Sequence, residues 1–212
     1  GRRALASALD FIFEQPPIES VPRAKTFRGA LEALPRANLA LISVPGDFAA
    51  AEARKAPGAG LNALVFSSGV PLEEERELKL LAKEKGLLLM GPDCGTALIA
   101  GTPVAFANAV PRGDIGIVSA SGTGLQEVTC RIHNLGGGIS QALGTGGRDL
   151  KEEIGGITML QGLAALAADP GTRVIVLISK PPAPAIARRI EDAAAAAGKP
   201  VVIHFLGAAP QR

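Results

Sequence analysis

From Asn38 onward the chain repeats one unit: an apolar run, a turn of small residues and an amphipathic helical segment. Strands covered by helices on both faces read as near-continuous apolar runs, and connections between parallel strands need a crossover that is usually a helix. The repeat therefore predicts an α/β protein with parallel sheets. Strands are expected in the runs LALISVPG, NALVFSSGVP, LLLMGPDCG, IGIVSA, GISQALG, RVIVLIS and PVVIHFL.

Helices are expected between these runs. An Ala-rich helix should be capped by Asp47 and broken at Pro57, and the segment after Pro71 carries acidic residues at its start and Lys at its end, as the helix dipole favours. Three more helices should follow Gly122, span 157–168 and span 183–197.

The segment 96–112 lacks clear periodicity and contains Pro103 and Pro111, which predicts a domain boundary near Pro111. Residues 1–30 read as an N-terminal helix and linker, 31–110 as a first α/β domain, and 111–212 as a flavodoxin-like open sheet. The sequence begins without Met and both ends interrupt a pattern, so we expect it to be part of a longer protein.

Composition excludes several classes of partner. The 22 basic and 20 acidic residues are scattered, and aromatic residues make up 3% with no Trp or Tyr, so we expect no nucleic acid as a partner. No apolar run reaches the length of a membrane span, so we expect no membrane association. The two cysteines do not form a disulfide framework or a metal-ligand spacing, which fits a reducing cytoplasm and no metal site.

Five small-residue turns follow predicted strands: VPGDF, FSSGVP, GPDCGT, SASGTG and GTGGRDL. The carboxyl ends of parallel strands meet at one edge of a sheet, so these turns should converge on a ligand site. In SASGTG, the N–H groups of Gly122, Thr123 and Gly124 at a helix start could bind an anion. The alternative is that Ser121 or Thr123 only caps the helix.

Two cations could complete an anion site. Arg148 follows Gly146 and Gly147 in GTGGRDL, and a guanidinium beside exposed backbone N–H groups suits phosphate or carboxylate. Lys180 is held at a strand end because Pro181 biases it toward an extended conformation. The alternatives are that Arg148 pairs with Asp149 or a nearby Glu, and that Lys180 is a solvated strand-end lysine.

The remaining reactive side chains fit structural roles better. His133 on a predicted helix and His204 in the last strand have no carboxylate or Ser neighbour in a motif spacing. Cys94 is either a thiol activated by a helix N-terminus or a small turn residue near a ligand. The glycine-rich turns form neither a G-x-G-x-x-G nor a Walker A pattern.

The stretches VPGDFAAAEARKA, SSGVP, LLLMGPDCG and IGIVSASGTG together resemble the α-subunits of succinyl-CoA synthetases and the wider ADP-forming acyl-CoA synthetase family. The FdrA-like branch is most similar, through GPDCGT, GTPVAFANAV, SASGTGLQEV, GTGGRDL and ISKPP. The resemblance implies a Rossmann-like CoA-binding domain, here incomplete at its N-terminus, followed by a flavodoxin-like ligase domain.

The resemblance also implies roles for individual residues. The phosphate-binding helix N-terminus of the family corresponds to Ser121, Gly122 and Thr123. The family's CoA contacts correspond to Val44, Pro45, Ser67, Ser68, Asp93 and Cys94.

This sequence departs from the family in three places. The glycine-rich loop that opens the family's CoA domain is not in the chain, nor is its phosphohistidine loop, and Lys180 stands where the family has a glutamate that supports that histidine. An ammonium at that position suits a free anion.

Three functions stay open at this point. The first is an acyl-CoA synthetase-like subunit that binds CoA and an acyl or carbamoyl phosphate, with ATP or ADP and Mg²⁺ used through a β-type partner subunit or a homo-oligomer. The second is a carbamoyl- or acyl-transferase subunit without phosphohistidine, in nitrogen or ureide catabolism. The third is a non-catalytic binding module.

Overall fold

The computed structural model describes residues 24–207. The chain divides into a first unit, 1–37, and a second unit, 38–212. In the first unit, helix α2 (Phe27–Ala33) begins after Thr26, whose hydroxyl accepts the Gly29 N–H at 3.0 Å. The segment expected to be an amphipathic helix upstream of this, 4–13, lies outside the described residues, and α2 runs across the expected boundary at residue 30.

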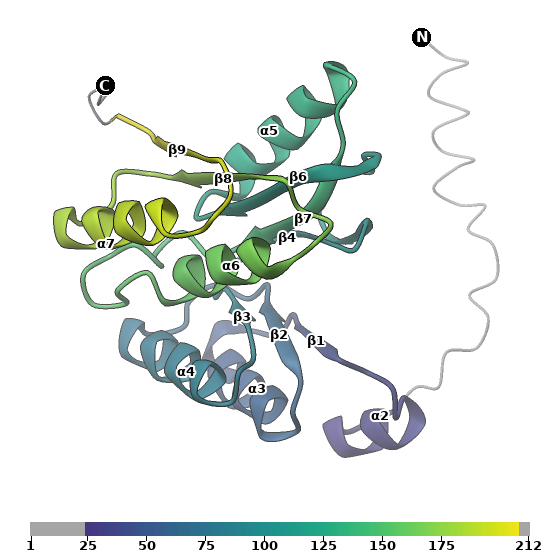
Figure 1. Ribbon diagram of the computed structural model, residues 1–212. Helices are drawn as coiled ribbons and strands as arrows, with labels where there is room; N and C mark the ends of the chain where they lie inside the picture. Colours follow the sequence, from purple (N-terminus) through teal and green to yellow (C-terminus); the bar gives the residue numbers. More distant parts are fainter. Residues whose placement is uncertain (1–23, 208–212) are drawn as a thin grey trace, which may run out of the picture. The chain divides into compact units, whose positions relative to one another are not determined.

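A three-stranded parallel sheet opens the second unit, in the order β1 (Leu39–Ile42), β2 (Asn62–Val65) and β3 (Leu89–Met90). Helices α3 (Gly46–Gly58) and α4 (Leu72–Glu84) connect these strands and contact each other (Figure 1). The predicted strand and helix alternation of this part is confirmed.

Helix α3 differs from the prediction at both ends. Its N-cap is Pro45, so Asp47 lies in the first turn and does not cap the helix. The helix continues through Pro57 and ends one residue later, because the N–H groups of Ala59 and Gly60 bond the carbonyl groups of the last turn. A proline this close to the end removes few internal bonds.

The second sheet has six strands, in the order β5-β4-β7-β6-β8-β9. The predicted parallel strands form its centre and one edge, in the order expected of a flavodoxin-like sheet: β7 (Ile139–Gly144), β6 (Arg112–Ser119), β8 (Val174–Ser179) and β9 (Val201–Phe205). Helix α5 (Gly122–Asn134) covers one face, and α6 (Ile157–Ala168) and α7 (Pro184–Ala195) cover the other (Figure 1).

The segment predicted to be irregular forms a hairpin. Strands β4 (Thr96–Ile99) and β5 (Thr102–Ala105) pair with each other, and β4 also pairs with β7, both antiparallel, so this sheet is mixed. The change of sheet therefore falls between Met90 and Thr96, and Pro111 separates two strands of the same sheet. Four-residue strands are too short to show a clear period in sequence.

One hydrophobic core joins the two sheets. Leu64 and Met90 of the first sheet belong to the same buried cluster as Val118, Leu143 and Met159 of the second sheet and its helix α6. The sheets are thus two layers of one compact unit, and their carboxyl ends are fixed relative to each other.

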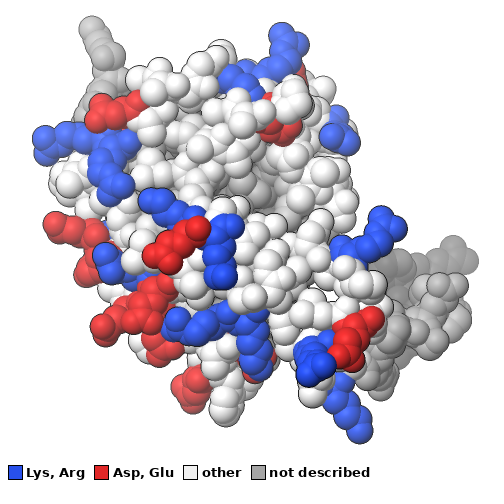
Figure 2. All heavy atoms as spheres, turned by 60° about the horizontal axis from the view of Figure 1, so that its bottom comes forward, with Lys and Arg blue, Asp and Glu red and all other residues white. Residues whose placement is uncertain are grey.

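The surface carries mixed charge. On the face drawn in Figure 2, basic and acidic side chains of the described residues are interspersed. Within residues 24–207, no helix is long and apolar enough to cross a membrane.

Candidate active site

Two cavities open at the carboxyl ends of the strands. The first, which we call the α3 cavity, has a volume of about 570 Å³ and is lined by the turns after β1 and β2. Its lining residues are Ser43, Val44, Pro45, Gly46, Phe66, Ser67, Ser68, Asp93, Gly95 and Phe106. The second, the α5 cavity, has a volume of about 290 Å³ and lies at the start of α5.

The α5 cavity is lined mainly by turns that follow strands. The turns after β6, β7 and β8 contribute to its wall, together with the turn after β3. Its residues are Asp93, Cys94, Gly95, Thr96, Phe106, Ser119, Ala120, Ser121, Gly122, Thr123, Gln126, Gly144, Gly146, Gly147 and Lys180.

The two cavities adjoin. Asp93, Gly95 and Phe106 line both, and the Phe106 ring meets the ring of Phe66 edge to face with 5.2 Å between centroids.

Most of the predicted site residues line one of these two cavities, as expected for turns at the carboxyl ends of parallel strands. Val44, Pro45, Ser67 and Ser68 line the α3 cavity, Asp93 lines both, and Cys94, Ser121, Gly122, Thr123, Gly146, Gly147 and Lys180 line the α5 cavity. Gly124 and Arg148 line neither.

Ser121 caps α5 and also lines the α5 cavity. Its hydroxyl accepts the Gly124 N–H at 3.2 Å, which takes that donor away from a ligand and corrects the expectation for Gly124. Ser119 fixes the cap, since its hydroxyl accepts the Ser121 N–H at 3.0 Å and donates to the Ser121 carbonyl at 2.8 Å. The cap leaves Gly122 and Thr123 at the cavity with helix-start N–H groups.

Gly146 and Gly147, on the turn after β7, also line the α5 cavity. Gly146 has φ +84°, and a Cβ there would overlap the carbonyl oxygen of Pro92. Only glycine allows this approach of two backbones. Lys180, exposed at the end of β8, is the cation that lines the cavity.

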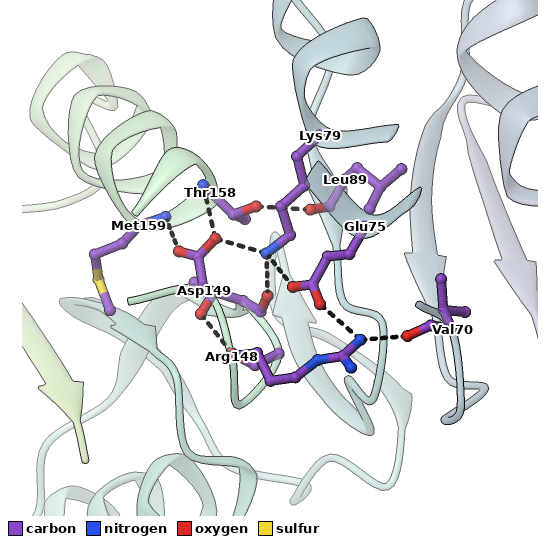
Figure 3. Close-up of polar contacts among 10 residues, drawn as sticks. Val70, Glu75, Lys79, Leu89, Arg148, Asp149, Thr158 and Met159 are labelled. Carbon is purple, nitrogen blue, oxygen red and sulfur yellow. Dashed lines mark hydrogen bonds and ion pairs between the residues drawn. The ribbon is translucent and has the colours of Figure 1, made fainter. Parts of the chain in front are cut away.

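Arg148, a predicted anion ligand, is not among the residues that line the α5 cavity. Its guanidinium lies 2.7 Å from Glu75 Oε2 and donates to the Val70 carbonyl at 2.8 Å (Figure 3). Pairing with a Glu was the predicted alternative, but the partner is a fully buried residue of α4 rather than a surface neighbour.

The sequence analysis missed Glu75 and Lys79, which are fully buried on α4. Both alternate with Leu78 and Ala82 on the buried face of that helix, at the i, i+3, i+4, i+7 spacing of a core stripe. The sequence signal that could have identified them was a pair of opposite charges at helix positions that should be buried.

Burial raises the pKa of the Glu75 carboxyl above 4.5, while the charges of Lys79 and then Arg148 act in the opposite direction. The contacts of Glu75 are ion pairs, because neither of its oxygens accepts a well-aligned hydrogen bond within the described residues. A carboxylate in such surroundings is costly unless its cations stay in place.

Burial also raises the pKa of the Cys94 thiol. Its Sγ lies 3.7 Å from the Thr96 carbonyl oxygen, to which it donates. The shift is opposite to that of an activated nucleophile, which fits a buried turn residue beside the α5 cavity. His133 lies on α5 and His204 on β9, as predicted, and neither lines the two cavities.

Part of the chain matches a known family of protein domains. Residues 112–207 match the CoA binding domain family. This match covers strands β6 to β9 and the turns after β6, β7 and β8, whereas the CoA-binding domain was predicted at 31–110.

Two curated relatives are similar over most of the chain. The uncharacterized protein YahF of Escherichia coli K12 is 58% identical over 184 residues, covering 87% of this chain and 36% of that protein. Subunit alpha 2 of the ADP-forming succinate–CoA ligase of Archaeoglobus fulgidus is 31% identical, covering 81% of this chain and 59% of that subunit. The chain therefore spans only part of the length of these relatives.

A solved structure shares the fold. The ATP citrate lyase of Methanothrix soehngenii, determined with citrate and coenzyme A, superposes with a TM-score of 0.72 at 21% identity, over 86% of this chain and 31% of that one. It confirms the predicted α/β fold with parallel strands.

The chain has an α/β fold with parallel strands, and its residues 112–207 are similar to the CoA binding domain family. In sequence, the chain is similar to the α-subunits of ADP-forming succinate–CoA ligases and of a malate–CoA ligase.

Proposed function

We propose that the protein is an α-type subunit of an acid–thiol ligase, which holds CoA along the α3 cavity and the phosphate of an acyl or carbamoyl phosphate in the α5 cavity. The observation that carries the proposal is the shared wall of Asp93, Gly95 and Phe106 between the two cavities. A thiol delivered from one cavity would meet an acyl phosphate held in the other, and holding two reactants in contact is a large part of catalysis.

The α3 cavity supports CoA by its shape and by its backbone. Ser67 joins the turns after β1 and β2, and Val44, Pro45 and Ser68 flank it at the cavity. The rigid turns present carbonyl and N–H groups to a long polar ligand without further ordering. The assignment to this cavity rests on the family resemblance, and the matched CoA binding domain supports CoA as the ligand of the chain.

The α5 cavity supports an anion by three independent features. The helix start at Gly122 and Thr123 carries partial positive charge, Gly146 and Gly147 line the cavity with backbone, and Lys180 adds a full charge. These groups would stabilise the charge that collects on phosphate oxygens as an acyl phosphate reacts.

A β-type partner subunit would supply the nucleotide, with Mg²⁺, and the carboxylic or carbamoyl substrate. The relatives are named as α-subunits of ligases, and this chain covers part of their length. A cytoplasmic location fits such a role.

A second candidate is a transferase subunit that works without a phosphohistidine. Neither histidine of the described residues lines the cleft, while Lys180 places a cation at its wall. A cation suits a phosphate that enters as a free anion.

Binding and turnover measurements separate these functions. We expect calorimetry to show CoA and inorganic phosphate bound at the same time by the purified protein. Turnover with a β-type partner in the presence of ATP, CoA and a carboxylic acid supports the ligase. Turnover only with carbamoyl phosphate and an amide acceptor supports the transferase. Binding without turnover under either condition supports a binding module, and no binding of CoA removes the proposal.

A further inference from the structure

The turn 145–149, which we call the glycine loop, is fixed almost entirely by residues from elsewhere in the chain. Within it only Gly147 is exposed, while Thr145, Gly146 and Asp149 are buried. The Thr145 N–H donates to the Ser119 carbonyl at 2.8 Å, and the Thr145 carbonyl accepts the Gly91 N–H at 3.3 Å. The position of Gly146 and Gly147 at the α5 cavity therefore depends on what anchors the two ends of this loop.

Lys79 anchors both ends from α4, a helix of the other sheet. Its Nζ donates to the Thr145 carbonyl at 2.9 Å and to Asp149 Oδ1 at 2.6 Å (Figure 3). The same Nζ lies 3.3 Å from Glu75 Oε1, one turn earlier on α4. Lys79 and its three partners, Thr145, Asp149 and Glu75, are all fully buried.

Glu75 anchors the loop through Arg148, as Figure 3 shows. Glu75 Oε2 lies 2.7 Å from the Arg148 guanidinium, which also donates to the Val70 carbonyl just before α4. The loop is thus tied to α4 at Thr145, Arg148 and Asp149, on both sides of Gly146 and Gly147.

Asp149 also binds the first turn of α6. Its Oδ2 accepts the Met159 N–H at 2.8 Å and its Oδ1 accepts the Thr158 N–H at 3.2 Å. Asp149 thereby satisfies the start of a helix whose own N-cap, Gly156, has no side-chain acceptor.

From these contacts we infer that Lys79 and Glu75 are positioning residues of the α5 cavity, which hold Gly146 and Gly147 where they meet the phosphate. The inference rests on the proposed function for its ligand. A buried ion cluster contributes little stability compared with apolar side chains of similar volume. What it specifies is a geometry, because each ion needs a particular partner in a particular place.

The test removes one charge of each sign. In the variant Glu75→Gln/Lys79→Met, the cluster keeps its net charge, but the loop loses the hydrogen bonds from Lys79 to Thr145 and Asp149 and the ion pair of Arg148 with Glu75. We expect the affinity for inorganic phosphate to fall about tenfold or more, since small displacements of binding groups have large effects. The affinity for CoA in the α3 cavity should stay within about twofold, because no residue of the glycine loop lines that cavity.

The matched control is Arg54→Met/Glu77→Gln. This variant also removes one charge of each sign from a pair that includes α4, with 3.0 Å between Arg54 Nη2 and Glu77 Oε2, but the pair is exposed and does not contact the glycine loop. It should bind phosphate and CoA like the unaltered protein.

Amide hydrogen exchange gives a readout that needs no ligand. Peptides covering 144–149 should exchange faster in Glu75→Gln/Lys79→Met, and peptides covering 43–46 and 66–68 should not. Unchanged exchange in the loop, or an equal loss of phosphate and CoA affinity in a folded variant, overturns the inference. If the unaltered protein binds no phosphate, the proposed function fails, and the exchange data alone then decide the positioning role.

A second variant, Glu75→Gln/Lys79→Gln, is measured in parallel. It removes the same two charges and fills more of the space with polar atoms, but a glutamine side chain at position 79 is one atom shorter than lysine and cannot make both contacts of Lys79, with the Thr145 carbonyl and with Asp149. If the methionine variant does not fold, this variant carries the same comparison, with the same results supporting or overturning the inference.

Discussion

Ser67 and Val44 form a double hydrogen bond between two turns that are 23 positions apart in sequence. The Ser67 hydroxyl accepts the Val44 N–H at 2.9 Å and donates to the Val44 carbonyl at 2.6 Å. One buried hydroxyl thus satisfies both backbone groups of a residue at the α3 cavity.

Ser67→Ala should therefore lower both stability and CoA affinity. Leaving the two Val44 groups without a partner costs about 1–3 kcal/mol in the free energy of unfolding. Urea unfolding and calorimetry with CoA measure the two effects. Ser68→Ala is the control, because Ser68 is exposed at the same cavity, and it should leave stability unchanged. Equal stability of the two variants would contradict the role of Ser67.

Gly122→Val should remove phosphate binding without unfolding the protein. A Cβ at Gly122 meets no atom within 4 Å, so a branched side chain extends into open space at the α5 cavity instead of into the core. Phosphate affinity should fall by about 2 kcal/mol or more as the helix start is covered, on the scale of a charged hydrogen bond. Gly58→Val, at an equally open position at the end of α3, is the matched control. Unchanged phosphate affinity in a folded Gly122→Val would return SASGTG to the role of a helix cap alone.

Lys180→Met should weaken phosphate binding and reduce its dependence on salt. A charge-assisted contact is worth about 1.5–3 kcal/mol, and removing the cation also removes its long-range attraction, which salt screens. Titrations with phosphate at low and high ionic strength measure both. Lys151→Met removes an exposed lysine that lines neither cavity and should leave binding unchanged. An affinity for phosphate that is the same in Lys180→Met and the unaltered protein would exclude Lys180 from the site.

Arg148→Met should act on stability, in contrast to a ligand-binding arginine. It leaves the buried Glu75 carboxylate with one cation fewer, and breaking a buried pair costs about 3–5 kcal/mol. The Arg148 side chain is 33% exposed, so water will reduce this cost. The double variant Arg148→Met/Glu75→Gln should recover part of the loss in urea unfolding. A double variant no more stable than Arg148→Met would show that the charge of Glu75 is not the cause.

Stability should fall as the pH rises above 4.5 because of Glu75. Its pKa is raised in the folded protein, so between the unfolded and folded pKa values the native state binds more protons than the unfolded chain. Stability falls with pH wherever the native state binds more protons. Glu75→Gln removes this contribution, so its stability relative to the unaltered protein should improve with rising pH. Glu73→Gln, exposed on the same helix, is the control, and a pH-independent difference for Glu75→Gln would refute the assignment.

Periodicity alone was enough to predict most of the architecture. Apolar runs with helical segments between them place β6 to β9 in parallel order and α6 at 157–168, because helix-covered strands must be apolar throughout. The convergence of small-residue turns on one cleft follows from the same rule, since the carboxyl ends of parallel strands share an edge.

Only the tertiary structure decided how the two sheets meet and which charges face the ligand. The hairpin of β4 and β5 joins the second sheet through contacts with β7 that are more than 40 positions away in sequence, and no local pattern encodes such pairing. Arg148 looked like an anion ligand beside two glycines, but its guanidinium pairs with Glu75 of α4 at 2.7 Å and does not line the α5 cavity. A charge binds the partner that folding brings within reach, and here Lys79 and Asp149 meet across 70 residues because the two sheets share one core.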